Sequence, residues 1–272
     1  MLRQQDDLAS QHHTWGIDMR SSVYLAVTAI VAAVALTGCT NHANQSTAPQ
    51  GTNASNLNQP SSGSTAAPMV QLAWSHVGTF FDEPQVWYVA RVKNPGKSVA
   101  SVALNARALD KTGTIIGSSQ DDLPNIPGGA TFDYFGYLGG GGAFDTDLTG
   151  TPAKIQVSQT KNAFGQAGAI ELPMLKTSEL KFAEGTEDTN TNAPLSYNLT
   201  VKVTNSTRDE LTGGVTQQVV LYDAAGHVVG GDTGASDNVP DSFPAGMSYR
   251  EKWTGIPALS KVTRAVYTVW AG

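Results

Sequence analysis

The sequence is poor in the residues that most chemistry requires. In 272 positions it has one cysteine, Cys39, five histidines and 15% charged residues. A lone cysteine cannot form a disulfide within the chain, so the disulfide framework of many small secreted domains is excluded. No thiol nucleophile is available beyond Cys39, and a net charge of −6 disfavours nucleic-acid binding.

Cys39 follows an apolar N-terminal segment. Residues 23–36, VYLAVTAIVAAVAL, come shortly after Arg20 and are nearly all apolar. This run is shorter than the about 20 residues that a membrane-spanning helix needs, and small residues follow it, as in a secretory signal. Leu36-Thr37-Gly38-Cys39 resembles the lipobox of bacterial lipoproteins. That resemblance implies cleavage before Cys39 and a lipid on its thiol, so we expect residues 1–38 to be a signal peptide.

The start of this signal is expected at Met19, with Met1 as the alternative. A signal peptide begins with basic residues, whereas the first 18 residues include three aspartates. Met19 is followed directly by Arg20, which fits such a start.

Residues 39–68 are expected to form the lipidated cysteine and a disordered tether. Residues 40–68 contain no Asp, Glu, Lys or Arg and one large aliphatic residue, Leu57. Such a segment buries too little apolar surface to offset its conformational entropy. As a flexible chain it has a root-mean-square reach of about 30 Å, which would hold the following residues away from a membrane surface.

The rest of the chain contains two copies of one unit, because three sequence blocks recur in the same order. We place the first copy at residues 69–160 and the second at residues 179–272. The matching blocks are residues 89–94 with 200–205, residues 102–117 with 215–230, and residues 126–132 with 243–249.

Residues 161–178 connect the copies and are expected to be ordered. Unlike the tether, this connector is rich in large apolar side chains, and burying each is worth about 1.5–3 kcal/mol. We therefore expect it to pack against one or both copies. Its large apolar residues are Phe164, Ile170, Leu172, Met174 and Leu175.

Both copies have the apolar alternation of β-strands and no segment with helical periodicity. Val86, Tyr88, Ala90 and Val92 alternate with other residues, which is the period of a half-buried strand. In the block at 102–117 and its counterpart, Asp-x-x-Gly predicts a hairpin turn. Six or seven short strands in each unit favour an all-β fold with two tandem immunoglobulin-like antiparallel β-sandwiches.

The second copy resembles a known domain family. Val220-Leu221-Tyr222-Asp223, the turn at Gly226, and Phe243-Pro244-Ala245-Gly246 are similar to the FxLYD domain of bacterial surface lipoproteins. Val219 stands in place of the family's phenylalanine, and the first copy has Ala108-Leu109-Asp110 instead of Leu-Tyr-Asp. The resemblance implies an extracytoplasmic immunoglobulin-like module with no assigned chemistry.

Candidate metal ligands are few and scattered. His76 and His227 do not align between the copies, so we expect surface or turn residues instead of a site that needs several converging ligands. Residues 188–192, DTNTN, resemble the first half of a calcium loop. However, Ala193 stands where that loop needs Gly, and Leu199 where it needs Glu.

The acidic pairs and the glycine run have simpler explanations than chemistry. Asp121 with Asp122, and Asp237 with Asp241, are expected to be solvated loop charges. The run of glycines at residues 139–142 has no Lys-Ser/Thr after it and indicates flexibility more than a phosphate loop.

We therefore expect a non-enzymatic lipoprotein anchored through Cys39 to the outside of the bacterial cell membrane. Its two modules would serve binding or structural roles towards a protein or cell-envelope partner, with no cofactor, metal or nucleic acid. The alternative is a non-catalytic accessory subunit of an envelope enzyme or transporter.

Overall fold

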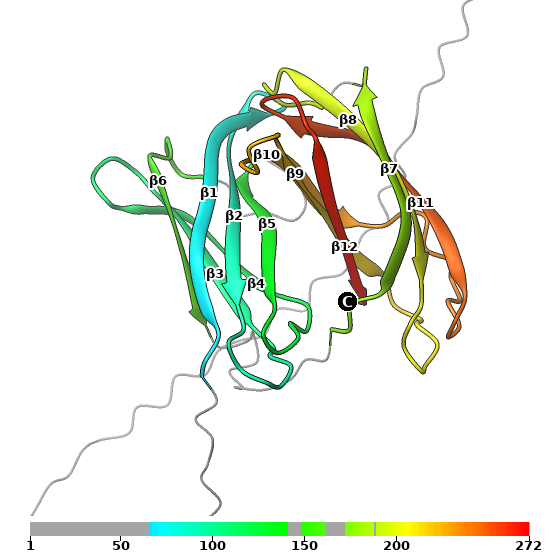
Figure 1. Cartoon of the computed structure of the whole chain (residues 1–272). Coiled ribbons are helices and arrows are strands. Elements are labelled where there is room, and N and C mark those ends of the chain that lie inside the picture. Colours follow the sequence, from blue (N-terminus) through cyan, green and yellow to red (C-terminus); the bar gives the residue numbers. More distant parts are fainter. Residues whose placement is uncertain (1–65, 141–147, 161–171, 188, 272) are drawn as a thin grey trace, which may run out of the picture. The chain divides into compact units, whose positions relative to one another are not determined.

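The computed structural model describes residues 66–140, 148–160, 172–187 and 189–271. Within these ranges the chain forms twelve β-strands and no helix, so the predicted all-β class is confirmed (Figure 1). Cys39, the predicted signal and most of the predicted tether lie outside the described residues.

The first repeat consists of two three-stranded antiparallel sheets, with the strand orders β1-β2-β5 and β4-β3-β6. Apolar side chains from both sheets form one buried cluster that includes Tyr88, Leu104 and Leu138. The strands are β1 (Met69–Phe80), β2 (Glu83–Lys93), β3 (Ala103–Leu109), β4 (Ile115–Asp122), β5 (Thr131–Gly139) and β6 (Lys154–Thr160).

The second repeat has the same strand order in a single six-stranded sheet, β12-β9-β10-β11-β8-β7. The series β7-β8-β11 repeats β1-β2-β5, and β10-β9-β12 repeats β4-β3-β6. The two halves join where Gly230 of β10 pairs with Ala258 of β11. The strands are β7 (Lys176–Gly185), β8 (Leu195–Thr204), β9 (Val215–Tyr222), β10 (Val228–Ala235), β11 (Ser248–Ala258) and β12 (Arg264–Ala271).

A buried asparagine holds the same loop in both repeats. Asn94 Nδ2 donates hydrogen bonds of 2.9 Å to the carbonyl oxygens of Ser98 and Ile126. Its counterpart Asn205 donates to the carbonyl oxygens of Asp209 and Phe243, at 2.9 and 2.7 Å. Equivalent side chains thus bind equivalent backbone atoms, which supports the duplication read from the sequence.

The predicted Asp-x-x-Gly hairpin turns are confirmed. Asp223 Oδ1 accepts hydrogen bonds from the backbone N–H groups of Ala225 and His227, at 2.9 and 2.8 Å. Gly226 closes this turn with φ = 83°, a conformation that favours glycine. Asp110 accepts in the same way from Thr112 and Thr114 in the first repeat.

The second repeat has its own apolar core. Val219 and Leu221, which the sequence places inside it, are 0% and 1% exposed. They pack with residues of β8, β11 and β12, including Leu199, Ile256 and Val269. The predicted burial of Val219 and Leu221 is confirmed.

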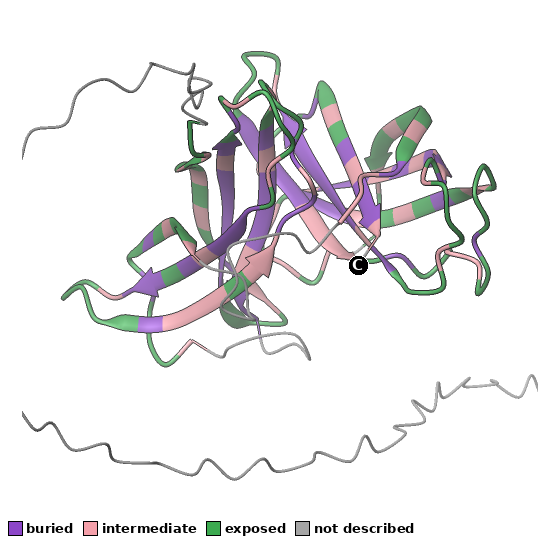
Figure 2. Ribbon diagram, turned by 90° about the horizontal axis from the view of Figure 1, so that it is seen from below, coloured by how far each residue is buried: buried purple, intermediate pink, exposed green. Residues whose placement is uncertain are grey.

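A third apolar cluster joins the repeats. Trp87, Val89 and Phe135 of the first repeat pack against residues of β9 and β10 in the second. Strand β2 is therefore buried on both faces, and its prediction as a half-buried strand is wrong for this reason. Figure 2 shows that the buried segments gather in the inner strands, whereas the loops are largely exposed. The residues contributed by β9 and β10 are Val220, Tyr222 and Val228.

The described end of the connector, residues 172–178, contacts both repeats. Leu172 and Met174 pack against the core of the first repeat, and Leu175 belongs to the core of the second. Leu175 N–H donates to the carbonyl oxygen of Val269 at 2.9 Å, and β7 already begins at Lys176. Phe164 and Ile170 lie outside the described residues.

Candidate ligand pocket between the repeats

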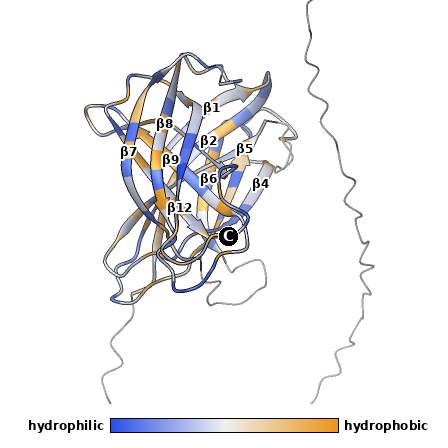
Figure 3. Ribbon diagram, turned by 90° about the vertical axis from the view of Figure 1, so that its right-hand side faces the viewer, coloured by the Kyte–Doolittle hydropathy of each residue, from blue (hydrophilic) through white to orange (hydrophobic). Residues whose placement is uncertain are grey.

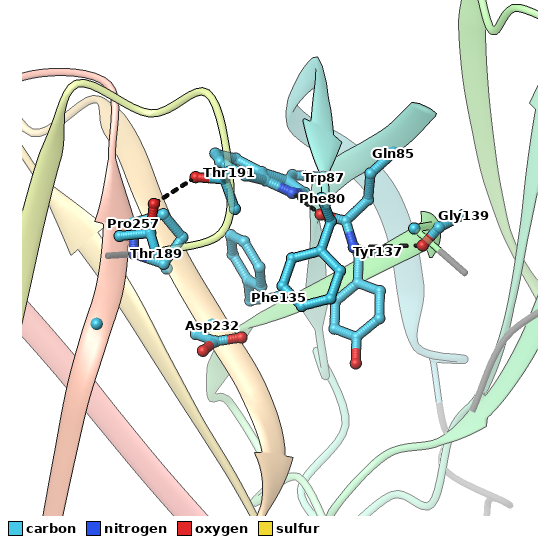
Figure 4. Close-up of a pocket in the computed structure, with 13 residues that line it drawn as sticks. Phe80, Gln85, Trp87, Phe135, Tyr137, Gly139, Thr189, Thr191, Asp232 and Pro257 are labelled. Carbon is cyan, nitrogen blue, oxygen red and sulfur yellow. Dashed lines mark hydrogen bonds between the residues drawn. The ribbon is translucent and has the colours of Figure 1, made fainter. Parts of the chain in front are cut away.

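A pocket of about 160 Å³ lies where the sheet β1-β2-β5 meets β10, β11 and the loop before β8 (Figure 4). Both repeats contribute to its walls. The lining residues are Phe80, Gln85, Trp87, Phe135, Tyr137, Gly139 and Gly140 from the first repeat, and Thr189, Thr191, Gly231, Asp232, Gly255 and Pro257 from the second.

Strand alternation places the aromatic side chains of the pocket on one face of the sheet. Trp87 of β2 pairs with Tyr137 of β5, and Val89 pairs with Phe135. Since residues two apart on a strand share a face, Trp87, Phe135 and Tyr137 all project away from the core of the first repeat. This aromatic face extends onto β1, where His76 pairs with Trp87 at a ring-centroid distance of 5.4 Å.

The Gln85 side chain holds Trp87 in place through hydrogen bonds. The buried Gln85 side chain accepts a hydrogen bond from the Trp87 indole N–H and donates one of 3.2 Å to the carbonyl oxygen of Gly139. The polar atom of the buried Trp87 side chain is therefore satisfied within the protein.

Asp232 supplies the single acidic side chain among the described residues of the lining. Its carboxylate accepts a 2.8 Å hydrogen bond from the Thr233 N–H. Burial raises the pKa of Asp232 to about 7, although this bond and a second from the Trp253 indole lower it. In Figure 4, Asp232 comes from one side of the pocket, and Phe80 and Tyr137 come from the other.

Glycine leaves room for Phe135 beside β10. A Cβ atom on Gly231 would lie 2.7 Å from the Phe135 ring and 2.3 Å from the carbonyl oxygen of Val219. Atoms do not approach that closely, so any other residue at Gly231 would push the sheets apart at the pocket.

Buried hydrogen bonds next to the pocket fix the junction of the repeats. The fully buried Gln218 of β9 accepts from the Phe135 N–H at 3.0 Å and donates to the carbonyl oxygen of Asp133 at 2.8 Å. A buried amide that reached no partner would cost about 1–3 kcal/mol, so this pair of bonds selects one arrangement of β5 against β9.

Asp133 is held by charged and polar partners from both repeats. Arg91 donates two hydrogen bonds to its carboxylate, at 2.7 and 2.8 Å, and the Tyr222 hydroxyl donates one at 2.9 Å. Burial alone would raise the pKa of Asp133, but the bonds from Arg91 and Tyr222 outweigh it and lower this pKa. The Arg264 guanidinium lies 3.7 Å from the centroid of the Tyr222 ring.

The two histidines have different environments. His227 is exposed and occupies the hairpin turn after Gly226, as predicted. His76 lies in β1 between Trp74 and Trp87, where burial lowers its pKa and its Nε2 has no hydrogen-bond partner. The prediction of a surface or turn residue is therefore wrong for His76, because the aromatic face of the sheet covers it.

The two predicted acidic pairs also differ in their exposure to solvent. Asp237 and Asp241 are exposed, as expected of solvated charges. Asp121 instead lies in β4 and accepts hydrogen bonds from the hydroxyls of Tyr88 and Ser119, at 3.3 and 3.2 Å. Burial raises the pKa of Asp121, so its prediction as a solvated loop charge is wrong.

The pocket residues are not among the site residues predicted from the sequence. Cys39, the one predicted site residue, lies outside the described residues, as does Asp188 of the calcium-like segment. The sequence did contain a signal, however, because residues 86–90 of β2 and 219–222 of β9 are continuous apolar or aromatic runs, as expected of strands covered on both sides. The aromatic residues at positions 87, 135 and 137 also share one face.

In the described part of the chain, no group of three His, Cys, Asp or Glu side chains is arranged to hold a metal ion. The same part contains no helix of the length and hydropathy needed to cross a membrane.

Comparison with known proteins assigns no family. No protein-family profile and no curated protein sequence matches the chain. Among solved structures, the chain is similar to red sea bream transglutaminase, with 13% identity over 70% of this chain and 27% of that chain, and a TM-score of 0.18. A likeness this slight carries no conclusion about activity.

Proposed function

We propose that the protein is a non-catalytic ligand-binding lipoprotein, held outside the bacterial cell membrane by lipid on Cys39. Its two immunoglobulin-like repeats form one semi-rigid unit on the tether of residues 40–68. The observation that carries the binding role is the pocket whose walls come from both repeats. A ligand in such a pocket would contact both repeats at once, so binding would depend on the fixed junction between them.

The two histidines of the described region support a role without catalysis. His76 Nε2 has no hydrogen-bond partner, and the His227 ring lies 3.3 Å from the turn residue Asp223. Neither forms the hydroxyl–imidazole pair of a nucleophilic enzyme.

The anchor is tested by Cys39→Ala. This variant should move from the membrane fraction to the soluble fraction or stall before cleavage, and its mass should lack the lipid. Stable attachment requires two or more acyl chains, because one chain binds a membrane only marginally. Thr40→Ala, which keeps the thiol, is the matched control and should stay in the membrane. Unchanged mass and membrane attachment of Cys39→Ala would refute the anchor.

The role of the two repeats is tested by crosslinking the wild-type protein in membranes and identifying the molecules that it contacts. Stable co-purification with an envelope enzyme or transporter would favour the alternative of an accessory subunit. Contact with ligand or envelope material alone would favour the binding role proposed here.

A further inference from the structure

We propose that the pocket between the repeats binds a small organic cation with a methylated ammonium head, seated against Phe80 and Tyr137 and paired with Asp232. This inference names the ligand class of the proposed binding function and rests on that function. The size, the walls and the charge of the pocket each support it.

The size of the pocket suits such a head group. Its volume is about 160 Å³. An engineered protein cavity of about 150 Å³ accepts benzene, and a trimethylammonium group is of comparable size. Larger ligands would have to leave part of their surface outside.

The walls offer aromatic surface. The half-buried rings of Phe80 and Tyr137 line the pocket, and Trp87 and Phe135, which are 2% and 1% exposed, pack beside them. The face of an aromatic ring carries negative electrostatic potential, so it attracts a cation. Quaternary ammonium groups fit best here because they have no N–H donors to leave unpaired.

The charge of the lining has one sign. Among the lining residues that the structure describes, Asp232 is the only Asp, Glu, Lys, Arg or His. An anion would therefore meet a carboxylate and ring faces, both of which repel it. A metal ion is a poorer fit than an organic cation, because it needs several oxygen ligands and the described residues of the lining offer one carboxylate.

Binding should depend on the ionisation of Asp232. The groups bonded to it are the Thr233 N–H and the Trp253 indole of β11, neither of which is charged, and the described lining contains no other ionisable carboxylate, amine, guanidinium or imidazole. With a pKa of about 7, Asp232 is mostly protonated at acidic pH and mostly ionised at alkaline pH. Since the cation pairs with the ionised form, affinity should rise about tenfold between about pH 6 and 8.

Titration calorimetry of the full chain in non-ionic detergent tests this, with choline chloride as the probe. The control ligand is 3,3-dimethyl-1-butanol, which has the shape of choline without the charge. We expect saturable choline binding that strengthens with pH, and at least about fivefold weaker binding of the neutral alcohol at about pH 8. No saturation by choline, or equal binding of the alcohol, would overturn the proposal.

Two charge-removing variants test whether the Asp232 carboxylate contributes to choline binding. Asp232→Asn should weaken choline binding about tenfold at about pH 8 and remove its pH dependence. Asp237→Asn removes the same charge from an exposed position and should bind as the wild type does. Equal effects of the two variants would overturn the role of Asp232. Tyr137→Leu, a second variant, should weaken choline more than the alcohol.

These results can be separated from those on the anchor. If choline fails to bind while Cys39→Ala still leaves the membrane, the ligand class is wrong and the anchored lipoprotein stands. If choline binds and Cys39→Ala stays membrane-attached with unchanged mass, the ligand class stands and the anchor is wrong.

Discussion

The two repeats share their loops but differ on the outer face of the corresponding sheets. Val89 and Phe135 form a pair between β2 and β5, and the equivalent pair between β8 and β11 is Thr200 and Lys252. The first pair is buried by the second repeat, whereas Lys252 is exposed. Figure 3 shows hydrophilic and hydrophobic bands alternating along β8, as expected of a sheet with one solvated face.

The covering face of the second repeat has changed in a matching way. Val220 and Gln218 of β9 contact the first repeat, and the equivalent positions of β3 are Arg107 and Asn105. Arg107 is exposed. The repeats therefore join through different sheets, β1-β2-β5 of one and β9-β10 of the other. The differences between the repeats that matter for their junction therefore lie on the two surfaces that contact each other.

The largest effect should come from the residue pair that differs most. Phe135→Ala should lower the free energy of unfolding by about 3–5 kcal/mol, because it leaves a cavity at the junction. Lys252→Ala, at the equivalent position of the second repeat, should change it by no more than about 0.5 kcal/mol. Urea unfolding measures both. Similar losses in the two variants would show that the junction is not buried as described.

The cores of the repeats offer the next comparison. Leu221 is 1% exposed, and the matching residue of the first repeat is Ala108. Leu221→Ala should still cost about 2–5 kcal/mol, because its neighbours are packed around a leucine. Thermal or urea unfolding would reveal this loss. A change within about 0.5 kcal/mol would place Leu221 on the surface and refute the assigned strand face.

The buried asparagines should show how alike the repeats are. Asn94→Ala and Asn205→Ala should each cost about 1–3 kcal/mol, because each leaves two backbone carbonyl groups without their donor. The two losses should be similar, since the bonds are equivalent. A large loss for one variant and none for the other would mean that only one loop depends on its asparagine.

The smallest effect concerns Asp133, whose counterpart in the second repeat is Arg250. The pKa of Asp133 is lowered in the folded protein, so its contribution to stability is present above the pKa of the unfolded chain. It is lost as the pH falls through the folded pKa. The stability difference between wild type and Asp133→Asn should therefore be constant near neutral pH and shrink below about pH 4. A difference independent of pH would exclude this origin.

Much of the fold could be predicted because its signals are local. The apolar alternation of Val201 and Val203 and the turn residues Asp223 and Gly226 act within a few positions of the chain. Strands β1 and β7 were not predicted, since both lie at sheet edges with largely exposed side chains and carry no strong alternation.

The candidate site could not be predicted in the same way. Trp87 and Asp232 are far apart in the sequence, and neither belongs to a recurring catalytic or metal-binding pattern. Their proximity depends on which face of β2-β5 is covered by the second repeat, and on the room that Gly231 leaves for Phe135.

Local sequence was thus sufficient for the all-β class, the turns and the duplication, because backbone conformation and strand period depend on neighbouring residues. The junction, the ionisation of Asp232 and the pocket were decided by tertiary structure. They arise from the contact of two distant surfaces, where burial changes both the exposure of Trp87 and the pKa of Asp232. An apolar residue such as Val89 predicts a strand whether one face or both faces of that strand are buried. Only the contact with the second repeat determines that both faces of β2 are buried.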